Sequence, residues 1–197
     1  MQGIISVIKG KQKKYEAEYG SLFLITIGSV VAFVVLTVSL HFLQPGYNPV
    51  NQLMSELALG PYGIIMLFAF ITLALALSSL AFGIWQRNAN KIPAVVLLIG
   101  AVCFLGAGIL PIDVFNTAHV TLVFSSFLMC GLAMYLLPGC LSSILSAHDR
   151  MISWGLGGVL AVTVILGQEV LPTGIAQRVE AAILLIWVVI FAWRTAR

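Results

Sequence analysis

The stretch SLFLITIGSVVAFVVLTVSLHFL, residues 21–43, contains no Lys, Arg, Asp or Glu. About 20 consecutive apolar residues in an α-helix are enough to cross the hydrocarbon core of a bilayer. Five further stretches have this character, at about 61–85, 92–110, 117–145, 152–171 and 175–193. The sequence therefore predicts an all-α polytopic membrane protein, a bundle of six transmembrane helices.

The composition of the whole chain supports the same class. Of its 197 residues, 60% are hydrophobic and only 9% are charged, whereas soluble domains carry about 25% charged residues. The net charge of +3 comes from cations in short loops and tails beside the apolar stretches, as membrane insertion favours. We therefore expect the lipid bilayer as a partner and no nucleic acid.

The cations also predict an orientation. Lys and Arg are enriched in cytoplasmic loops, and nine of the ten cations here lie in alternate segments: Lys9, Lys11, Lys13 and Lys14; Arg87 and Lys91; Arg150; Arg194 and Arg197. Both termini are therefore predicted to be cytoplasmic, in an inner or plasma membrane. Residues 1–20 are expected to form a cytoplasmic amphipathic basic segment and residues 21–197 a single transmembrane domain.

The first extracytoplasmic loop contains YNPVNQLMSELALG, residues 47–60. Asn48 suits an N-cap, Pro49 the first helical position and Gly60 the end of a helix. The loop is therefore predicted to form a short helix at the extracytoplasmic interface. Its polar side chains Gln52, Ser55 and Glu56 allow two interpretations: a solvated face, or groups that point into the mouth of the bundle.

The link between the third and fourth stretches contains Asp113 and, two turns later, His119. In a structural interpretation Asp113 caps the next helix and His119 makes a local hydrogen bond. In a functional one the carboxylate orients the imidazole for general-base or metal-ligand work. Glu56, Asp113 and His119 are the candidate catalytic residues.

The last two stretches meet through Gln168-Glu169 and Gln177-Arg178-Val179-Glu180. Arg178 is the one cation expected on the extracytoplasmic side, so we expect Glu169 or Asp113 to pair with it, or a phosphate or carboxylate of a ligand. Glu180, a turn into the last span, should face the bundle interior. The candidate ligand-binding residues are Gln52, Ser55, Glu169, Gln177 and Arg178.

Three chemical patterns fit these residues. His41, Asp113 and His119 could hold a divalent cation as cofactor; Ser55, His119 and Asp113 could form a nucleophile, base and orienting acid; and the two histidines could ligate a haem. Four extracytoplasmic acids against one arginine require water access, protonation or a bound cation.

The motifs Tyr47-Asn48-Pro49 with Ser55-Glu56-Leu57, Pro111-x-Asp113 with His119, and Gln177-Arg178 resemble those of a six-span bacterial and archaeal membrane family, domain of unknown function 998. The resemblance covers about residues 20–195. It implies the six-span topology and no established activity. A more distant likeness is to the membrane hydrolases that include alkaline ceramidases and progestin/adipoQ-type receptors, which use a Ser, an Asp and three His around zinc. This chain lacks the His-x-x-x-His of their final helix.

The leading functional hypothesis is an extracytoplasmic-facing polar site that binds a lipid headgroup, a small polar ligand or a cation, with or without acting on it. The second is a non-catalytic accessory or assembly subunit that associates with other membrane subunits. A proton- or cation-coupled transporter is the third. The pattern is compatible with both binding and catalysis.

Overall fold

Helices account for every regular element in residues 2–87 and 90–196, the part of the chain that the computed structural model describes; side chains are described for residues 19–87 and 90–196. Six are long α-helices and one, η1, is a short 3₁₀-helix. In chain order they are α1 (Gln2–Leu43), η1 (Met54–Leu59), α2 (Ile64–Arg87), α3 (Ile92–Ile109), α4 (Asn116–Cys140), α5 (Ala147–Val170) and α6 (Thr173–Ala196).

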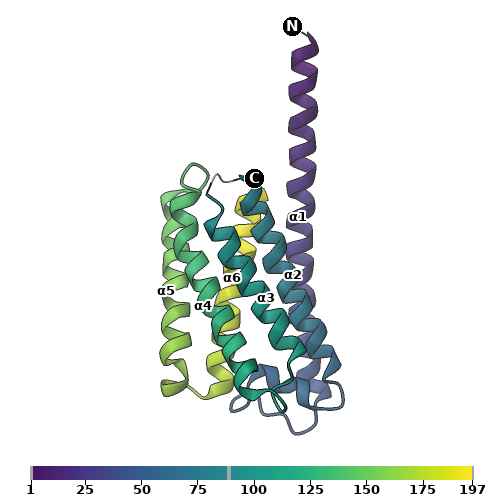
Figure 1. Ribbon diagram of the computed structural model, residues 1–197, viewed down its shortest axis with the longest axis vertical. Coiled ribbons are helices and arrows are strands. Elements are labelled where there is room, and N and C mark those ends of the chain that lie inside the picture. Colours follow the sequence, from purple (N-terminus) through teal and green to yellow (C-terminus); the bar gives the residue numbers. More distant parts are fainter. Residues whose placement is uncertain (1, 88–89, 197) are drawn as a thin grey trace.

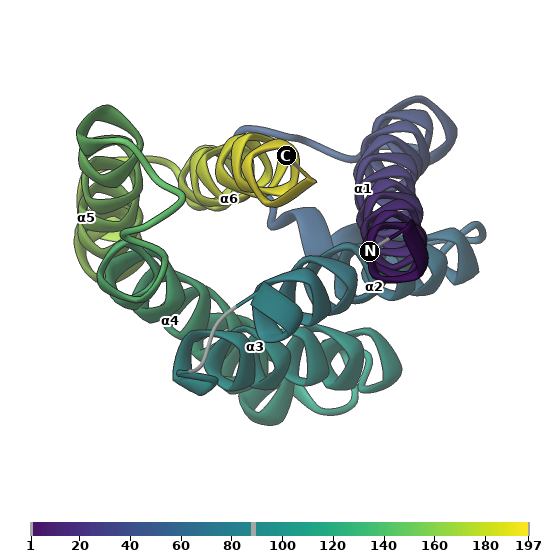
Figure 2. The ribbon, with the colours of Figure 1, turned by 90° about the horizontal axis from the view of Figure 1, so that it is seen from above.

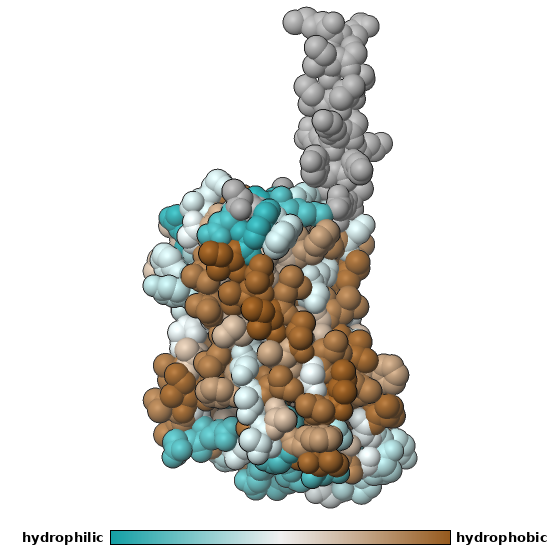
Figure 3. Space-filling view, in the orientation of Figure 1, coloured by the Kyte–Doolittle hydropathy of each residue, from teal (hydrophilic) through white to brown (hydrophobic). Residues whose placement is uncertain are grey.

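Each long helix contains a segment apolar and long enough to cross a membrane, which confirms the predicted six-span bundle. A hydrophobic band separates two hydrophilic ends of the molecule (Figure 3). The fourth span ends at Cys140 rather than near 145. Pro138, which has no N–H to donate, lies in its last turn, and the chain then turns through residues 141–145.

Seen from above, the six long helices form a ring in chain order, which α6 closes between α5 and α1 (Figure 2). Each helix packs on the next, and α6 also contacts α2 and α4. The C-terminus and the beginning of α1 lie at the same end of the bundle (Figure 1), which we call the terminal end. At the opposite end, the loop end, η1 contacts α1, α2 and α6.

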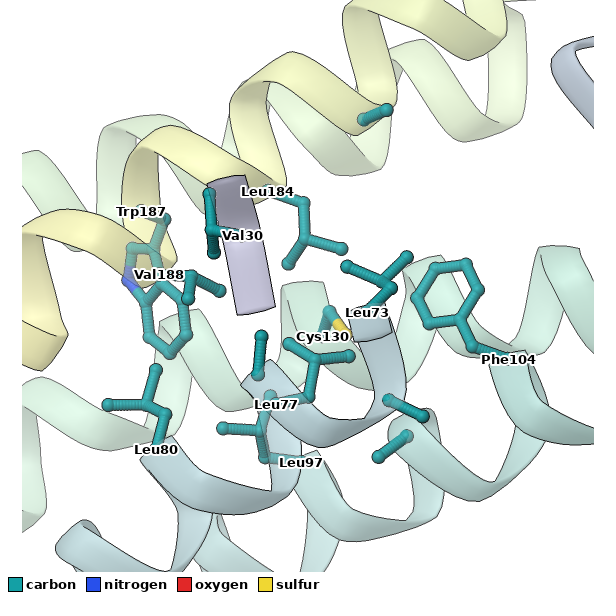
Figure 4. Close-up of a cluster of buried hydrophobic side chains, with 14 of the residues drawn as sticks. Val30, Leu73, Leu77, Leu80, Leu97, Phe104, Cys130, Leu184, Trp187 and Val188 are labelled. Atoms are coloured by element: carbon teal, nitrogen blue, oxygen red, sulfur yellow. The ribbon is translucent and has the colours of Figure 1, made fainter. Parts of the chain in front are cut away.

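The core is mostly apolar, and a buried polar connection joins α4, α5 and α6 within it. Trp187 and Leu184 of α6 are fully buried with Leu77 of α2 and Leu97 of α3 (Figure 4). The indole N–H of Trp187 donates to Ser153 Oγ at 2.9 Å, and this hydroxyl donates to the Met134 carbonyl at 2.6 Å. Since both bonds are buried, they fix the register of α4, α5 and α6 toward the terminal end.

The terminal end carries Lys91 between α2 and α3, and Arg87, Arg150 and Arg194 in the end turns of α2, α5 and α6. That this end is cytoplasmic stays a prediction. The backbone of α1 continues as one helix from Gln2 through the predicted basic segment into the first span. The side chains of residues 1–18 lie outside the described residues, so the amphipathic character of this segment also stays a prediction.

Candidate functional site

The segment between α1 and α2 covers the loop end, but it is not the single helix from Asn48 to Gly60 that the sequence predicts. Asn48 does start a turn: its Oδ1 accepts from the Val50 N–H at 3.0 Å. The chain then breaks at Leu53, and η1 begins at Met54. The break is stabilised from outside the segment, because the Met54 N–H donates to Gln177 Oε1 of α6 at 2.5 Å.

Glu56 and Gln52 hold this segment together. The Leu53 N–H donates to Glu56 Oε1 at 2.8 Å, and Gln52 Nε2 donates to Glu56 Oε2 at 3.2 Å. Gln52 Oε1 in turn accepts from the Asn48 N–H at 2.7 Å. Both carboxylate oxygens of Glu56 are therefore used to order the loop, a structural role for a residue predicted to be catalytic.

Close backbone contact fastens the loop to the start of α6. The Gly174 N–H donates to the Val50 carbonyl at 3.1 Å. A Cβ at residue 174 would lie 2.4 Å from the carbonyl oxygens of Pro49 and Gln52, so only glycine fits here.

Arg178 joins α6, α1 and the loop, and its partners are all uncharged. Its Nη1 donates to the carbonyls of Gly174 at 2.7 Å and Gln52 at 3.3 Å. Its Nη2 donates to Tyr47 Oη at 2.5 Å and to His41 Nε2 at 2.7 Å. Tyr47 Oη donates onward to the Leu53 carbonyl at 2.9 Å.

The expected partners of Arg178, Glu169 and Asp113, are both exposed. Among the side chains that the structure describes, no carboxylate lies within 4.0 Å of Arg178, so the predicted ion pair is wrong. The physical reason is topological: the loop places the Gln52 carbonyl and the Tyr47 hydroxyl beside Arg178, and with Gly174 and His41 they engage the guanidinium.

The expected Asp113–His119 pair is also not formed. His119 is 2% exposed, and its Nδ1 donates to the carbonyls of Ala107 at 2.9 Å and Leu110 at 2.8 Å. These carbonyls at the end of α3 lack helical partners and orient the imidazole in place of a carboxylate. Asp113 lies in the exposed turn after α3.

The three predicted metal ligands are not brought together. Within the described residues, no group of three or more His, Cys, Asp or Glu could hold a metal ion. His41 has both ring nitrogens engaged, because Nδ1 donates to the Thr37 carbonyl at 2.6 Å and Nε2 accepts from Arg178. Since an arginine only donates, His41 is neutral and its lone pair is occupied.

A different set of residues converges behind η1. A cavity of about 60 Å³, here called the polar cavity, lies between η1, α4, α5 and α6. Its polar lining consists of Ser55, His119, Gln168, Gln177 and Glu180. Toward the loop end, α4 diverges from α5 (Figure 1).

Two atoms in the lining of the polar cavity are buried without a protein partner: Ser55 Oγ and His119 Nε2. Because Nδ1 carries the proton in neutral His119, Nε2 presents a lone pair. Glu180 is 6% exposed, and no described side chain hydrogen-bonds or ion-pairs with its carboxyl group. Buried polar groups nearly always have partners, so Ser55 Oγ and His119 Nε2 require one from within the cavity, which the Glu180 carboxyl group also lines.

Of the polar lining, Ser55, His119 and Gln177 were predicted as site residues. The inward interpretation of the loop's polar face is thus correct for Ser55, which is 1% exposed. Glu180 was expected to face the interior and does, but was not chosen as a site residue. Its position three residues after Gln177 on one helix face, together with its depth in the span, is the signal that could have identified it.

These features define a polytopic α-helical membrane protein with a small polar cavity at one end of its bundle. The chain belongs to the family of proteins of unknown function named DUF998, whose sequence model matches residues 26–194, as the sequence motifs predicted. No curated protein and no solved structure matches the chain.

Proposed function

We propose that the protein binds, in the polar cavity, the hydrogen-bond-donating end of a small polar molecule or lipid headgroup. The observation that supports this most is that Ser55 Oγ and His119 Nε2 are buried without protein partners beside one cavity, which Glu180 also lines without an ion-pair partner. The set is rich in acceptors, because a neutral imidazole nitrogen and a carboxylate both accept. An ammonium group is the ligand that best matches them.

The charge of Glu180 favours a cationic ligand over a neutral one. A carboxylate buried in apolar surroundings is stable only when a proton or a cation compensates it. No arginine or lysine does so among the described side chains. The ammonium group of a ligand would supply that compensation and bind more tightly for it.

Size and access restrict the ligand further. A water molecule needs roughly 10–15 Å³ of such space, so about 60 Å³ admits only a few atoms of a larger molecule. The lining residues that reach the surface are Val120, Phe124 and Gln168. This mixture of apolar and amide side chains supports an entrance where the membrane meets water, within reach of a headgroup.

The test compares ethanolamine with ethylene glycol, which replaces the ammonium group by a hydroxyl at nearly the same size. At 100-fold excess over Kd, a ligand stabilises the folded state by about 2.7 kcal/mol. For a chain of this length that raises the unfolding temperature by roughly 5–10 °C. We expect this rise for ethanolamine in nanodisc-embedded protein at constant ionic strength, and a much smaller one for ethylene glycol.

Two variants locate the effect. Glu180→Gln should abolish the advantage of ethanolamine, and Ser55→Ala should weaken its binding about tenfold, the loss expected for one hydrogen bond of about 1.4 kcal/mol. Glu169→Gln, an exposed acid at the same end, is the matched control and should behave as the parent. Equal responses of the parent and Glu180→Gln proteins would contradict the proposal.

The accessory-subunit alternative rests on a separate observation. Arg178 of α6 bonds Tyr47 and Gln52 of the loop and His41 of α1, while Glu56 orders the loop itself. These residues act as a structural closure of the loop end. If neither ethanolamine nor ethylene glycol changes the unfolding temperature, the main role of the polar residues at the loop end is to close that end of the bundle.

A further inference from the structure

A second, larger cavity lies on the membrane side of the bundle, between α1 and α6. This open groove has a volume of about 500 Å³. Val34, Val38 and Phe42 of α1 line it with Ala182 and Leu185 of α6. His41 and Arg178 line its loop end, and they are the polar groups nearest the membrane surface there.

The length of the groove matches one acyl chain. Along α1 it extends from Phe33 to Phe42, nine helical steps of 1.5 Å each, or roughly 14 Å. Half of the ~30 Å hydrocarbon core is about 15 Å. The groove therefore covers the depth of one leaflet, from the level of Arg178 toward the middle of the membrane.

The charge at the loop end of the groove is positive and uncompensated. The partners of Arg178 are two backbone carbonyls, a tyrosine hydroxyl and a neutral histidine. Glu56, the acid of the neighbouring loop, is engaged by the Leu53 N–H and Gln52 and does not line the groove. An anion beside the guanidinium would neutralise it in an environment where charge is poorly screened.

One turn below His41, Thr37 also lines the groove, but its hydroxyl oxygen is buried and has no protein partner. The accessible surface of the groove is therefore almost entirely apolar, which suits an acyl chain.

From these features we propose that the groove between α1 and α6 binds an anionic phospholipid, with its phosphate beside Arg178 and one acyl chain along Phe33–Phe42. This site is distinct from the polar cavity, since the two share no lining residue. The groove would hold an anionic lipid in one leaflet, between α1 and α6, where α6 closes the ring of helices.

The experiment measures lipid preference at the groove. The full chain carrying Phe42→Trp, at the 85% exposed groove rim, is reconstituted in vesicles containing brominated phosphatidylglycerol or brominated phosphatidylcholine. Quenching in the parent protein, which has four native tryptophans, is subtracted. One cation beside an anionic lipid contributes about 1 kcal/mol, so we expect about a fivefold preference for phosphatidylglycerol.

Two further substitutions in the Phe42→Trp protein decide the result. Arg178→Gln should reduce the preference to about one. Ala182→Phe fills the groove from an exposed position and leaves Arg178 intact. It should also remove the preference, and it tests the proposal even if Arg178→Gln folds poorly. Ala118→Phe, at an exposed alanine of α4 outside the groove, is the matched control. Equal quenching by both lipids, or a preference unchanged by Ala182→Phe, would overturn the proposal.

Discussion

The two described arginines of α6 lie at opposite ends of the helix and have opposite kinds of partner. Arg194, at the terminal end, forms a 2.7 Å ion pair with Asp149, which is 3% exposed. Arg178, at the loop end, bonds only uncharged groups, while the buried Glu180 two residues away has no cation. The charges of Arg194 and Asp149 are neutralised within the protein and stabilise it. Those of Arg178 and Glu180 are not, and they remain available to a ligand.

At the terminal end, hydrogen bonds also engage the carboxylate of Asp149. Ser146 Oγ donates to Asp149 Oδ2 at 2.7 Å and accepts from the Asp149 N–H at 3.1 Å, which caps α5. Asp149 therefore has a helix to cap and a cation to neutralise. The acids that line or surround the loop end lack this double engagement, apart from Glu56.

The largest expected effect comes from breaking the closed end. Removing one partner of a fully buried ion pair costs about 3–5 kcal/mol. Since the Arg194 side chain is 30% exposed, we expect Asp149→Asn to lower the free energy of unfolding by about 2 kcal/mol. The measurement is the unfolding temperature in detergent, which should fall by roughly 4–8 °C. Asp113→Asn, at an exposed acid, is the control, and an equal fall there would refute the comparison.

Glu180→Gln should raise the free energy of unfolding, the opposite of the effect expected for Asp149→Asn. The substitution keeps the shape of the side chain and removes a charge that no described residue compensates, so we expect the ligand-free protein to gain about 1 kcal/mol. The same unfolding assay reads the gain, beside Glu169→Gln as an exposed control, which should stay within about 0.5 kcal/mol of the parent. A loss of stability comparable to that of Asp149→Asn would mean that Glu180 has a partner in the fold.

The smallest expected effect concerns Tyr47 and appears only at high pH. Burial raises the pKa of Tyr47, although the hydrogen bond and charge of Arg178 act in the opposite direction. The folded protein therefore keeps this proton when the unfolded chain releases it near pH 10. Stability from Tyr47 is complete below about pH 10 and is lost as the pH rises through the folded-state pKa.

We accordingly expect the parent to lose more stability than Tyr47→Phe between about pH 9 and about pH 11. Chemical unfolding curves of the two proteins at each pH provide the difference, in which the remaining tyrosines cancel. Parallel pH profiles would show that the Tyr47 hydroxyl contributes nothing to the closure of the loop end.

Much of the fold was predictable because membrane insertion imposes it on the sequence. Spans of about 20 apolar residues are dictated by bilayer thickness, and all six were identified. The interior orientation of Glu180 follows from the cost of exposing polar groups to lipid, whereas the sequence left Ser55 open between a solvated and an inward position. The error at the end of the fourth span came from extending an apolar run through Pro138, where helical propensity ends before hydrophobicity does.

The side-chain partners were harder to predict, and the errors have one cause. The sequence suggests pairing Arg178 with an acid and His119 with Asp113, because opposite charges attract. In the fold, backbone carbonyls of Gln52, Ala107 and Leu110 take those places. Every residue carries a carbonyl, so no sequence pattern distinguishes the few that lie beside a given side chain.

The sequence by itself therefore determined the class of protein, the number of spans and the end of the bundle where polar chemistry gathers, since these depend on composition along the chain. Only the tertiary structure decided which polar groups hydrogen-bond within the protein and which stay unpaired. That division depends on contacts between segments far apart in the chain, such as Gln177 with Met54. It leaves Ser55, His119 and Glu180 around one cavity and Arg178 at the end of a lipid-sized groove.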